Sequence, residues 1–362
     1  MSTILNHPLA LGVDLGGTKI HLVLAGQEGR AVAQVVQPTE AKKGLTGVMG
    51  NLLTGLYRVM KEAIEKESVG TQTVGKLTPD LGFGEIPDQV TLQTLKDILA
   101  QQGREVRGIG LVVAGVLSEE RTVIHESPNL GLVEVPLRDL LAENSGLPVW
   151  MENDTNAAAL GEYWYGAGKG QDPMVYMGLG TGIGGGLIIR GELYRGSHGG
   201  AGEIGHLVLE PQGPPCGQGH PGCLEAMVSG TALARAAQAA VDQGKGERLL
   251  QLAGGCRDKV AGPVVGQALA MGDQTARELV HQAGAYLGMG IASVINLLNP
   301  GLIVIGGGLA AGLWQPLLDA AWPEIELRAF PSLREKVQIV PAGLGEDSAA
   351  LGAAGIVHHQ FE

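Results

Sequence analysis

Residues 178–225 read GLGTGIGGGLIIRGELYRGSHGGAGEIGHLVLEPQGPPCGQGHPGCLE. A glycine-dense turn comes first, a strand-like apolar run follows, and the stretch ends with Glu-x-Gly-His and two cysteines that flank a histidine. Glycine lets a backbone approach a phosphate closely, whereas Glu, His and Cys side chains supply metal ligands and polar contacts. The stretch therefore predicts a phosphate turn and a ligand cluster, and the rest of the chain must supply the remaining parts of a phosphoryl-transfer site.

The strand–glycine turn–strand pattern occurs twice. Residues 9–25 (LALGVDLGGTKIHLVLA) and residues 174–193 (MVYMGLGTGIGGGLIIRGEL) both read this way, which is a weak indication of a duplicated architecture. In the first copy Asp14 ends a strand just before Gly16, Gly17 and Thr18. A carboxylate beside N–H groups and a hydroxyl can hold Mg²⁺ and terminal phosphates, although an ordinary glycine-rich hairpin fits this short motif equally well.

Length and composition predict an α/β protein of two lobes. The chain has 362 residues, of which 44% are hydrophobic, and its 59 glycines are about twice the average usage. The glycines follow no collagen-like period and lie among Val, Ile and Leu, as expected for many tight strand-to-helix turns.

Charge and cysteine usage exclude several classes of function. The formal net charge is −12 and no Lys/Arg-rich run occurs, so neither nucleic acid nor an anionic membrane is expected as a partner. Three cysteines make no disulfide framework, and with no signal peptide in view they favour a reducing, cytoplasmic location. The longest uncharged run, residues 282–318, contains Asn, Pro and a triple glycine, so we expect a buried helix and strand there and not a membrane span.

The remaining pattern alternates helices with short apolar strands. Apolar periodicity predicts helices at 46–65, 90–101, 135–145, 231–243, 277–298 and 349–360. Short apolar runs predict strands at 108–115, 147–151 and 301–308. Residues 125–130 are expected to be a loop, and residues 66–90 contain a polar segment without periodicity that we interpret as a surface insertion.

Residues 152–156 (ENDTN) hold two carboxylates and two amides where a strand passes into a helix. Any one of Asn153, Asp154 or Thr155 can be explained as the helix N-cap. The whole cluster exceeds what a cap needs, and such clusters at the carboxyl ends of strands are where open α/β sheets bind ligands.

Taken together, these pieces resemble the ROK family of sugar kinases, within the actin/hexokinase-like ATPase superfamily. The matching motifs are LGVDLGGTKI at 11–20, SPNL at 127–130, ENDTNAAALGE at 152–162, GLGTGIGGGLII at 178–189, AGEIGH at 201–206, GCLEAMVSG at 222–230 and IGGG at 305–308. Each motif alone is modest, but their order and spacing cover nearly the whole chain outside about 66–90.

The resemblance implies a two-lobed actin/hexokinase-like fold, that is, a duplicated ribonuclease H-like architecture with mixed sheets flanked by helices and a central cleft. It implies a small lobe of residues 1–125 plus about 340–362, and a large lobe of residues 126–339. Relatives of this kind are commonly dimers, so a homodimer is expected.

The resemblance also implies roles for individual residues. Asp154 would be the catalytic base, and the sugar hydroxyls would be held by Asn129, Asn153, Asp154, Glu203, His206 and Glu225. ATP and Mg²⁺ would be bound at the first phosphate motif, at the second one and beside the adenosine, by Asp14, Gly16, Gly17, Thr18, Lys19, Gly180, Thr181, Gly182, Gly306 and Gly307. The chemistry of these residue types agrees, because a carboxylate can accept the proton of a sugar hydroxyl while the phosphoryl group moves in line.

The resemblance also implies a structural zinc ion, although one usual ligand is missing here. The family pattern Cys-x-Cys-Gly-x-x-Gly-Cys-x-Glu has Gln218 in place of its second cysteine here. His206, Cys216, His220 and Cys223 would make a Cys₂His₂ set, an ordinary one for zinc. The alternative is a decayed site in which His220 is only a loop residue.

The resemblance predicts an ATP:hexose phosphotransferase that acts on the primary (6-) hydroxyl of glucose or a related hexose. N-acetylmannosamine, N-acetylglucosamine, fructose and allose remain open as substrates, because hydroxyl-holding residues look alike across sugar kinases. A sugar-responsive repressor is the main alternative of another class, but no basic helix precedes Leu9 to read DNA. The lack of a basic stripe also argues against polyphosphate as the phosphoryl donor.

Overall fold

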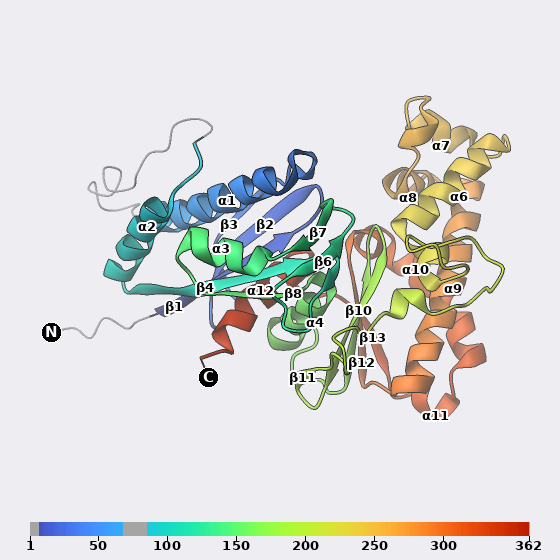
Figure 1. Ribbon diagram of the computed structural model, residues 1–362. Coiled ribbons are helices and arrows are strands. Elements are labelled where there is room, and N and C mark those ends of the chain that lie inside the picture. Colours follow the sequence, from blue (N-terminus) through green and yellow to red (C-terminus); the bar gives the residue numbers. More distant parts are fainter. Residues whose placement is uncertain (1–6, 68–84, 362) are drawn as a thin grey trace. The chain divides into compact units, whose positions relative to one another are not determined.

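The structure is a computed structural model that describes residues 7–67 and 85–361. The chain forms two compact units, each built on one five-stranded sheet flanked by helices (Figure 1). The first comprises residues 1–166, 197–199 and 347–362, and the second comprises residues 167–196 and 200–346. The mixed α/β class predicted from the sequence is confirmed. The central part of the predicted insertion, residues 68–84, lies outside the described residues.

The first unit contains the following elements: β1 (His7–Leu15), β2 (Lys19–Gly26), β3 (Ala31–Pro38), η1 (Ala41–Lys43), α1 (Gly44–Glu67), α2 (Gln89–Gln101), β4 (Arg104–Val113), β5 (Val116–Leu117), β6 (Ile124–Ser127), β7 (Leu132–Val135), α3 (Leu137–Ser145), β8 (Val149–Asn153), α4 (Asp154–Tyr165) and α12 (Ser348–His358). Its main sheet has the order β3-β2-β1-β4-β8, in which β1 is antiparallel to β2 and parallel to β4. β5, β6 and β7 form a separate small antiparallel sheet.

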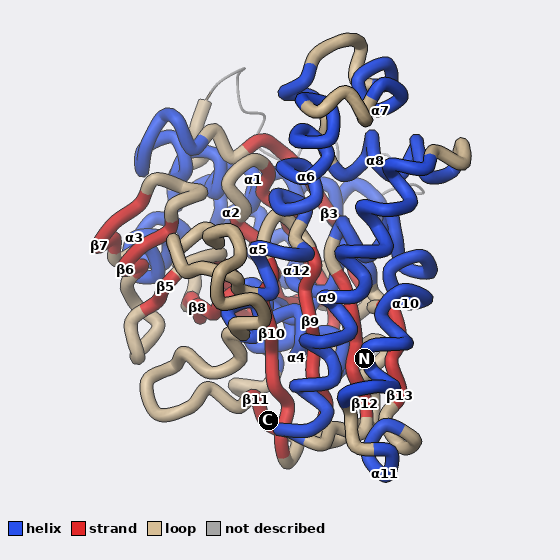
Figure 2. Tube along the Cα trace, turned by 90° about the vertical axis from the view of Figure 1, so that its right-hand side faces the viewer, coloured by secondary structure: helices blue, strands red, loops and turns tan. Residues whose placement is uncertain are grey.

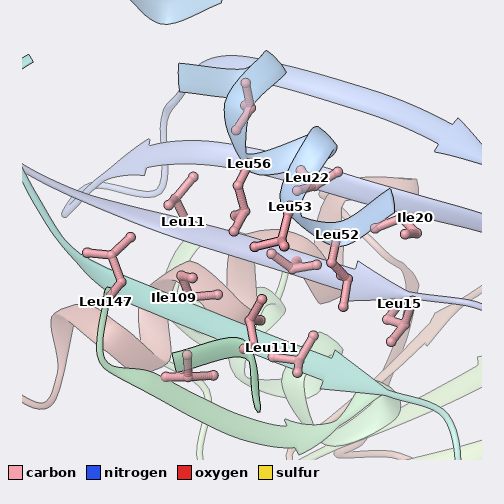
Figure 3. Close-up of a cluster of buried hydrophobic side chains, with 14 of the residues drawn as sticks. Leu11, Leu15, Ile20, Leu22, Leu52, Leu53, Leu56, Ile109, Leu111 and Leu147 are labelled. Carbon is pink, nitrogen blue, oxygen red and sulfur yellow. The ribbon is translucent and has the colours of Figure 1, made fainter. Parts of the chain in front are cut away.

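Strand β1 shows why this sheet is covered by helices on both faces. Leu9, Leu11, Val13 and Leu15 alternate along it and join the core against α1, as Figure 3 shows for Leu11, Leu15 and the α1 leucines. On the other face a side chain at Gly12 would collide with the carbonyl of Ala350 in α12. The last helix therefore packs directly on the first strand, and Asp14 alternates onto this same face.

The second unit contains the following elements: β9 (Met174–Leu179), β10 (Ile183–Ile189), β11 (Glu192–Leu193), η3 (Ile204–His206), α5 (Leu224–Val228), α6 (Gly230–Asp242), α7 (Glu247–Leu252), η4 (Arg257–Lys259), α8 (Gly262–Ala270), α9 (Gln274–Leu298), β12 (Leu302–Gly306), α10 (Gly308–Arg328), α11 (Pro331–Arg334), β13 (Gln338–Pro341) and η5 (Gly345–Asp347), the last of which reaches the boundary of the unit. The sheet order is β11-β10-β9-β12-β13 (Figure 2). Its core joins β9 and β12 to α9 and α10.

The two main sheets share one topology. In each, the first strand is antiparallel to the second and parallel to the fourth, and the outer strands follow in the same order. This agreement turns the weak sequence indication of a duplicated architecture into a structural fact.

Two expectations from the sequence differ from the structure. Residues 126–166 belong to the first unit and not to the second, because β8 pairs in parallel with β4. The expected loop at 125–130 begins as strand β6, whose buried residues Ile124 and Ser127 flank the exposed His125 and Glu126. This pattern does not alternate, so it carries no strand signal.

Among the described residues, no helix is both long and apolar enough to cross a membrane.

Candidate active site

Two carboxylates approach each other in the first unit. Asp14 precedes the last residue of β1, and Asp154 is the first residue of α4. Burial is the main cause that raises the pKa of Asp14 to about 7; the nearby Asp154 raises it further, and Lys19 opposes both effects. Burial also raises the pKa of Asp154. Two partly buried carboxylates with one lysine nearby form a site that favours a cation or a proton.

The backbone at the start of α4 orients Asp154. Asn153 is the N-cap, and its Oδ1 accepts from the N–H groups of Thr155 at 2.9 Å and Asn156 at 3.2 Å. Asp154 Oδ1 accepts from Thr155 N at 2.8 Å. Because Asn153 satisfies the helix end, Asp154 is not needed as a cap, and its carboxylate keeps acceptor positions for a ligand.

A buried ion pair that the sequence reading did not identify lies next to this cluster. Glu152 is 2% exposed, and its Oε2 lies 2.9 Å from Arg121 Nε. Its Oε1 accepts from Asn153 N at 3.0 Å and from Asn156 Nδ2 at 3.1 Å. Glu152 therefore fixes the backbone that carries Asp154. The ENDTN cluster was the available signal, but nothing in the sequence pointed to Arg121 as the partner.

The first glycine turn, residues 16–19, lies in the same unit. It closes with a bond from Gly16 N to Lys19 O at 3.0 Å. A side chain on Gly17 would place its Cβ 2.6 Å from the carbonyl oxygen of Asn129, so only glycine fits there. The structure thus brings Asn129, a residue assigned to sugar binding, directly against the first phosphate motif.

The second glycine turn, residues 180–182, joins β9 to β10 in the second unit. Gly180 N donates to Gly182 O at 2.9 Å, and Ile183 N just beyond the turn donates to Glu225 Oε2 at 3.0 Å. A side chain on Gly182 would collide with that same carboxylate. The carboxylate of Glu225, which is predicted to bind a sugar, therefore also supports the turn.

Gly306 and Gly307 lie where β12 passes into α10. Gly306 pairs with Gly178 across the parallel β9–β12 ladder, close to the second turn. Gly307 caps α10 with φ 90°, a left-handed conformation that favours glycine. The predicted adenosine segment and the second phosphate motif thus share one edge of the second sheet.

Four metal-ligating side chains converge in the second unit. Ligand atoms of His206, Cys216, His220 and Cys223 all lie within 4.8 Å of one another. Ligands at about 2.0–2.3 Å from a zinc ion lie about 3.3–3.8 Å apart in a tetrahedron, so a small contraction would close the set around a metal. Burial first, then the neighbouring Cys216 and Glu225, raise the pKa of the Cys223 thiol, and a bound cation would reverse this effect. The donor set and its geometry fit zinc.

The metal-ligand loop connects to the residues assigned to sugar binding. His206 Nδ1 lies 3.7 Å from Cys216 Sγ, whereas its Nε2 lies 3.9 Å from Glu203 Oε2. One ring nitrogen therefore faces the thiols and the other faces a carboxylate. Glu225 Oε1 accepts from Gly217 N at 3.2 Å, so the same carboxylate that supports the second turn also holds this loop.

The predicted site residues thus form two groups, one in each unit. The first group contains Asp14, Gly16, Gly17, Thr18, Lys19, Asn129, Asn153 and Asp154. The second contains Gly180, Thr181, Gly182, Glu203, His206, Cys216, His220, Cys223, Glu225, Gly306 and Gly307.

Comparisons of sequence and structure match the chain to known proteins. The profile of the ROK family matches residues 85–360. The glucokinase of Halalkalibacterium halodurans is 34% identical over 97% of this chain and 95% of its own length. The crystal structure of a ROK family glucokinase from Streptomyces griseus, in complex with glucose and AMPPNP, aligns with a TM-score of 0.76 at 29% identity, covering 97% of this chain and 99% of that one.

The similar proteins are not all enzymes. The xylose repressor of Caldicellulosiruptor bescii is 28% identical over 96% of this chain and 77% of its own length. The glucokinase relatives support a sugar kinase, and the site residues must distinguish it from a regulator.

Proposed function

Because the chain belongs to the ROK family, we propose that it is an ATP-dependent sugar kinase that phosphorylates the primary (6-) hydroxyl of glucose or a related hexose. The observation that carries this proposal is the pair Asp14 and Asp154, which lie close enough for their charges to interact at the end of the first phosphate strand. A regulator that only senses sugar has no need of this costly pair of partly buried carboxylates.

In the proposed reaction Asp154 acts as the general base. The sugar hydroxyl donates to its carboxylate, and the proton passes to Asp154 as the hydroxyl oxygen forms a bond to the γ-phosphorus of ATP. The bond from that phosphorus to the β,γ-bridging oxygen breaks, and ADP leaves. The base must be ionised to accept the proton, and positioning supplies most of the remaining rate enhancement.

The two glycine turns are the proposed phosphate contacts. Gly16, Gly17, Thr18 and Lys19 would contact the phosphates from the first unit, and Gly180, Thr181 and Gly182 from the second. Asp14 fits a Mg²⁺ ion that arrives with ATP, because burial and the neighbouring Asp154 raise its pKa to about 7 and a bound cation would stabilise the ionised carboxylate. Mg²⁺ bound there would neutralise phosphate charge. Gly306 and Gly307 would lie beside the adenosine.

The sugar would be held by hydroxyl-accepting side chains. Asn129 and Asn153 would contribute from the first unit, and Glu203, His206 and Glu225 from the second. Carboxylate and amide oxygens suit a ligand made of hydroxyl donors, because each carboxylate can accept two of them. Glu225 spends one lone pair on Ile183 N and one on Gly217 N, and keeps others for the sugar.

Zinc in the Cys₂His₂ set is proposed as structural. His206, Cys216, His220 and Cys223 would hold it, and it would supply no chemistry beyond ordering the loop and fixing the ring of His206. With Nδ1 directed to the thiols, Nε2 of His206 would remain for the sugar.

The test is a coupled assay of ADP release with glucose, mannose, fructose, allose, N-acetylglucosamine and N-acetylmannosamine. We expect the highest kcat/KM with glucose or a close relative, and no turnover above background for Asp154→Ala. A different preferred sugar on the panel would change the substrate and keep the reaction class. No turnover with any sugar, or full activity in the variant, would refute the assignment of Asp154. In that case retention of the protein on DNA at low salt would favour a regulator.

A further inference from the structure

Thr39 lies directly behind the first glycine turn. It follows β3, and its side chain is fully buried at 0% exposure. Its backbone N–H donates to the carbonyl of Thr18 at 3.0 Å, and its hydroxyl donates to the carbonyl of Gly16 at 2.5 Å. One residue thus binds two carbonyls of a four-residue turn from the protein side.

These two bonds set the direction in which the turn presents its polar groups. The carbonyls of Gly16 and Thr18 point to Thr39, and that of Lys19 accepts from Gly16 N at 3.0 Å. In the described part of the chain, the N–H groups of Gly17 and Thr18 donate to no protein acceptor. With carbonyls turned inward and N–H groups left open, the turn has the polarity of an anion-binding nest.

Thr39 is itself held in place by the helix behind it. Asn51, on α1, donates from Nδ2 to the carbonyl of Thr39 at 3.1 Å and to Glu40 Oε2 at 3.3 Å. Asn51 also accepts from the Gln37 side chain through its backbone carbonyl. Asn51 on α1 therefore fixes the position of Thr39, and through Thr39 the turn is connected to this helix by hydrogen bonds.

In the second unit, a threonine on a helix also donates to a carbonyl of the glycine turn. Thr231, in the first turn of α6, donates to the carbonyl of Thr181 from its hydroxyl at 2.9 Å and from its N–H at 3.3 Å. Its neighbour Gly230 donates to the carbonyl of Gly180 at 2.8 Å. A threonine thus bonds a carbonyl of each turn, supplied once after a strand and once by a helix, although Thr39 is buried and Thr231 is exposed. Because the two elements differ, the bond is not a by-product of the shared sheet topology.

We propose that Thr39 is a positioning residue for nucleotide binding, which acts by holding the carbonyls of Gly16 and Thr18 away from the phosphates. The proposal rests on the proposed function of this turn as a phosphate contact. Thr39 is fully buried, so it touches neither ATP nor sugar, and its effect passes through the turn. Without its hydroxyl the Gly16 carbonyl is free to rotate toward the phosphates, where it would repel them.

The experiment measures equilibrium binding of ATP with Mg²⁺, and of glucose, by isothermal titration calorimetry on wild type, Thr39→Val and Thr39→Ser. Valine keeps the shape and the N–H bond but removes the hydroxyl, so we expect Kd for ATP to rise about tenfold, as loss of a buried hydrogen bond commonly causes. Serine restores the hydroxyl, and its Kd should return to within about threefold of wild type. Glucose binding should stay within about twofold in both variants, because the loss is confined to the phosphate contacts.

Thr54→Val is the matched control. Thr54 also donates its hydroxyl to a backbone carbonyl, that of Gly50 at 2.8 Å within α1, and no bond joins it to residues 16–19. The same chemical change should leave Kd for ATP unchanged there. If Thr39→Val fails to fold, Asn51→Ala, which loosens the carbonyl of Thr39 without touching the turn, should produce the same selective loss of ATP binding.

Each outcome decides the proposal. A selective loss of ATP affinity that serine reverses supports it. A lower Tm with Kd for ATP equal to that of Thr54→Val would reduce Thr39 to a structural residue and overturn the proposal. Wild type that binds glucose but no ATP would refute the proposed kinase function itself, which is a separate result.

Discussion

The turn at residues 16–19 and the turn at residues 180–182 occupy the same place in two sheets of matching strand order, yet the chemistry around them differs. In the first sheet the closing pair of the hairpin is Leu15 and Ile20, and Asp14 precedes it. In the second the closing pair is Leu179 and Ile183, and Gly178 stands where Asp14 would be.

Partly and fully buried charges gather in the first unit, whereas the second turn lies close to one carboxylate and the thiols. Asp14, Asp154 and the Glu152–Arg121 pair all belong to the first unit. The second unit has Glu225 bound to two backbone N–H groups and the His/Cys quartet beside it. Under the proposed function, duplicating the fold duplicates the glycine turn, whereas the proposed general base occurs in one copy only.

The largest expected effect tests whether the catalytic charge resides in the first unit. Asp154→Asn should lower kcat by about 10²–10⁴-fold, the usual contribution of a general base. In wild type kcat/KM should fall as the pH is lowered, because a protonated carboxyl cannot accept a proton. The midpoint should lie above the ordinary Asp value of about 3.9, since burial raises the pKa of Asp154.

The matched control for this prediction is Asp273→Asn in the second unit. Asp273 also stands at a helix start, where its Oδ1 accepts from Ala276 N at 2.9 Å, and asparagine can replace it as a cap. Its kcat should stay within about twofold of wild type because a cap contributes to stability and not to chemistry. Equal losses in the two variants would contradict the assignment of acid–base chemistry to the first unit.

The second prediction compares ion pairs of the two units. Glu152→Gln should lower the free energy of unfolding by about 3–5 kcal/mol, because it leaves the Arg121 guanidinium, whose side chain is only 20% exposed, without its counter-charge. In the second unit Asp242 pairs with Arg257 through contacts of 2.7 Å, but their side chains are 52% and 46% exposed. Asp242→Asn should therefore leave stability nearly unchanged. Urea denaturation of both variants measures the difference, and equal costs would show that Glu152 is not a buried anchor.

The third prediction concerns the cost in folding stability of ionising Asp14, a cost that Gly178, at the corresponding position of the second sheet, does not impose. The folded-state pKa of Asp14 is about 7, above its unfolded value, so between about pH 4 and 7 the folded chain keeps a proton that the unfolded chain has lost. Wild-type stability should therefore fall as the pH rises through this window. Asp14→Asn carries no such penalty, so its free energy of unfolding should exceed that of wild type by about 2–3 kcal/mol at pH 7.5 and by little at pH 4.5. The difference follows from about 1.4 kcal/mol per pKa unit, reduced because Asp14 is partly exposed.

Urea denaturation without added Mg²⁺ or nucleotide, repeated across this pH range, provides the measurement. A gap between variant and wild type that does not change with pH would mean that Asp14 has an ordinary pKa in the folded chain.

Much of the fold and of the site follows from local sequence signals. The two glycine turns, the acid–amide cluster that contains Asp154 and the four metal-ligating side chains are each encoded within short segments. The sheet order confirms the duplication that the repeated strand–turn–strand pattern indicated. Short motifs are predictable because turn geometry and ligand type depend on neighbouring residues.

The parts that the sequence did not reveal depend on long-range contacts. Thr39 acquires its role because β3 returns the chain behind residues 16–18, and nothing around it marks it as a binding residue. Arg121 meets Glu152 only because its loop folds back toward β8. The first unit extends past the predicted boundary at residue 125 for a similar reason, since the parallel pairing of β8 with β4 retains residues 126–166 in it.

The smallest expected effect tests whether the second unit has replaced a missing thiolate with an imidazole. With Gln218 at the usual cysteine position, His220 completes the quartet. His220→Ala should therefore weaken zinc binding by at least about tenfold, because even the loss of a residue that only hydrogen-bonds to a metal ligand has an effect of this size. Zinc content after dialysis against a weak chelator, together with Tm, checks this, and Cys256→Ser is the control because Cys256 lies outside the quartet. Adding Gln218→Cys to His220→Ala should restore zinc, since it returns the family's own ligand.

If His220→Ala retains zinc as well as Cys256→Ser does, His220 is only a loop residue. If wild type itself binds none, the quartet is a relic, and the contrast between the units reduces to the acid–base chemistry of the first.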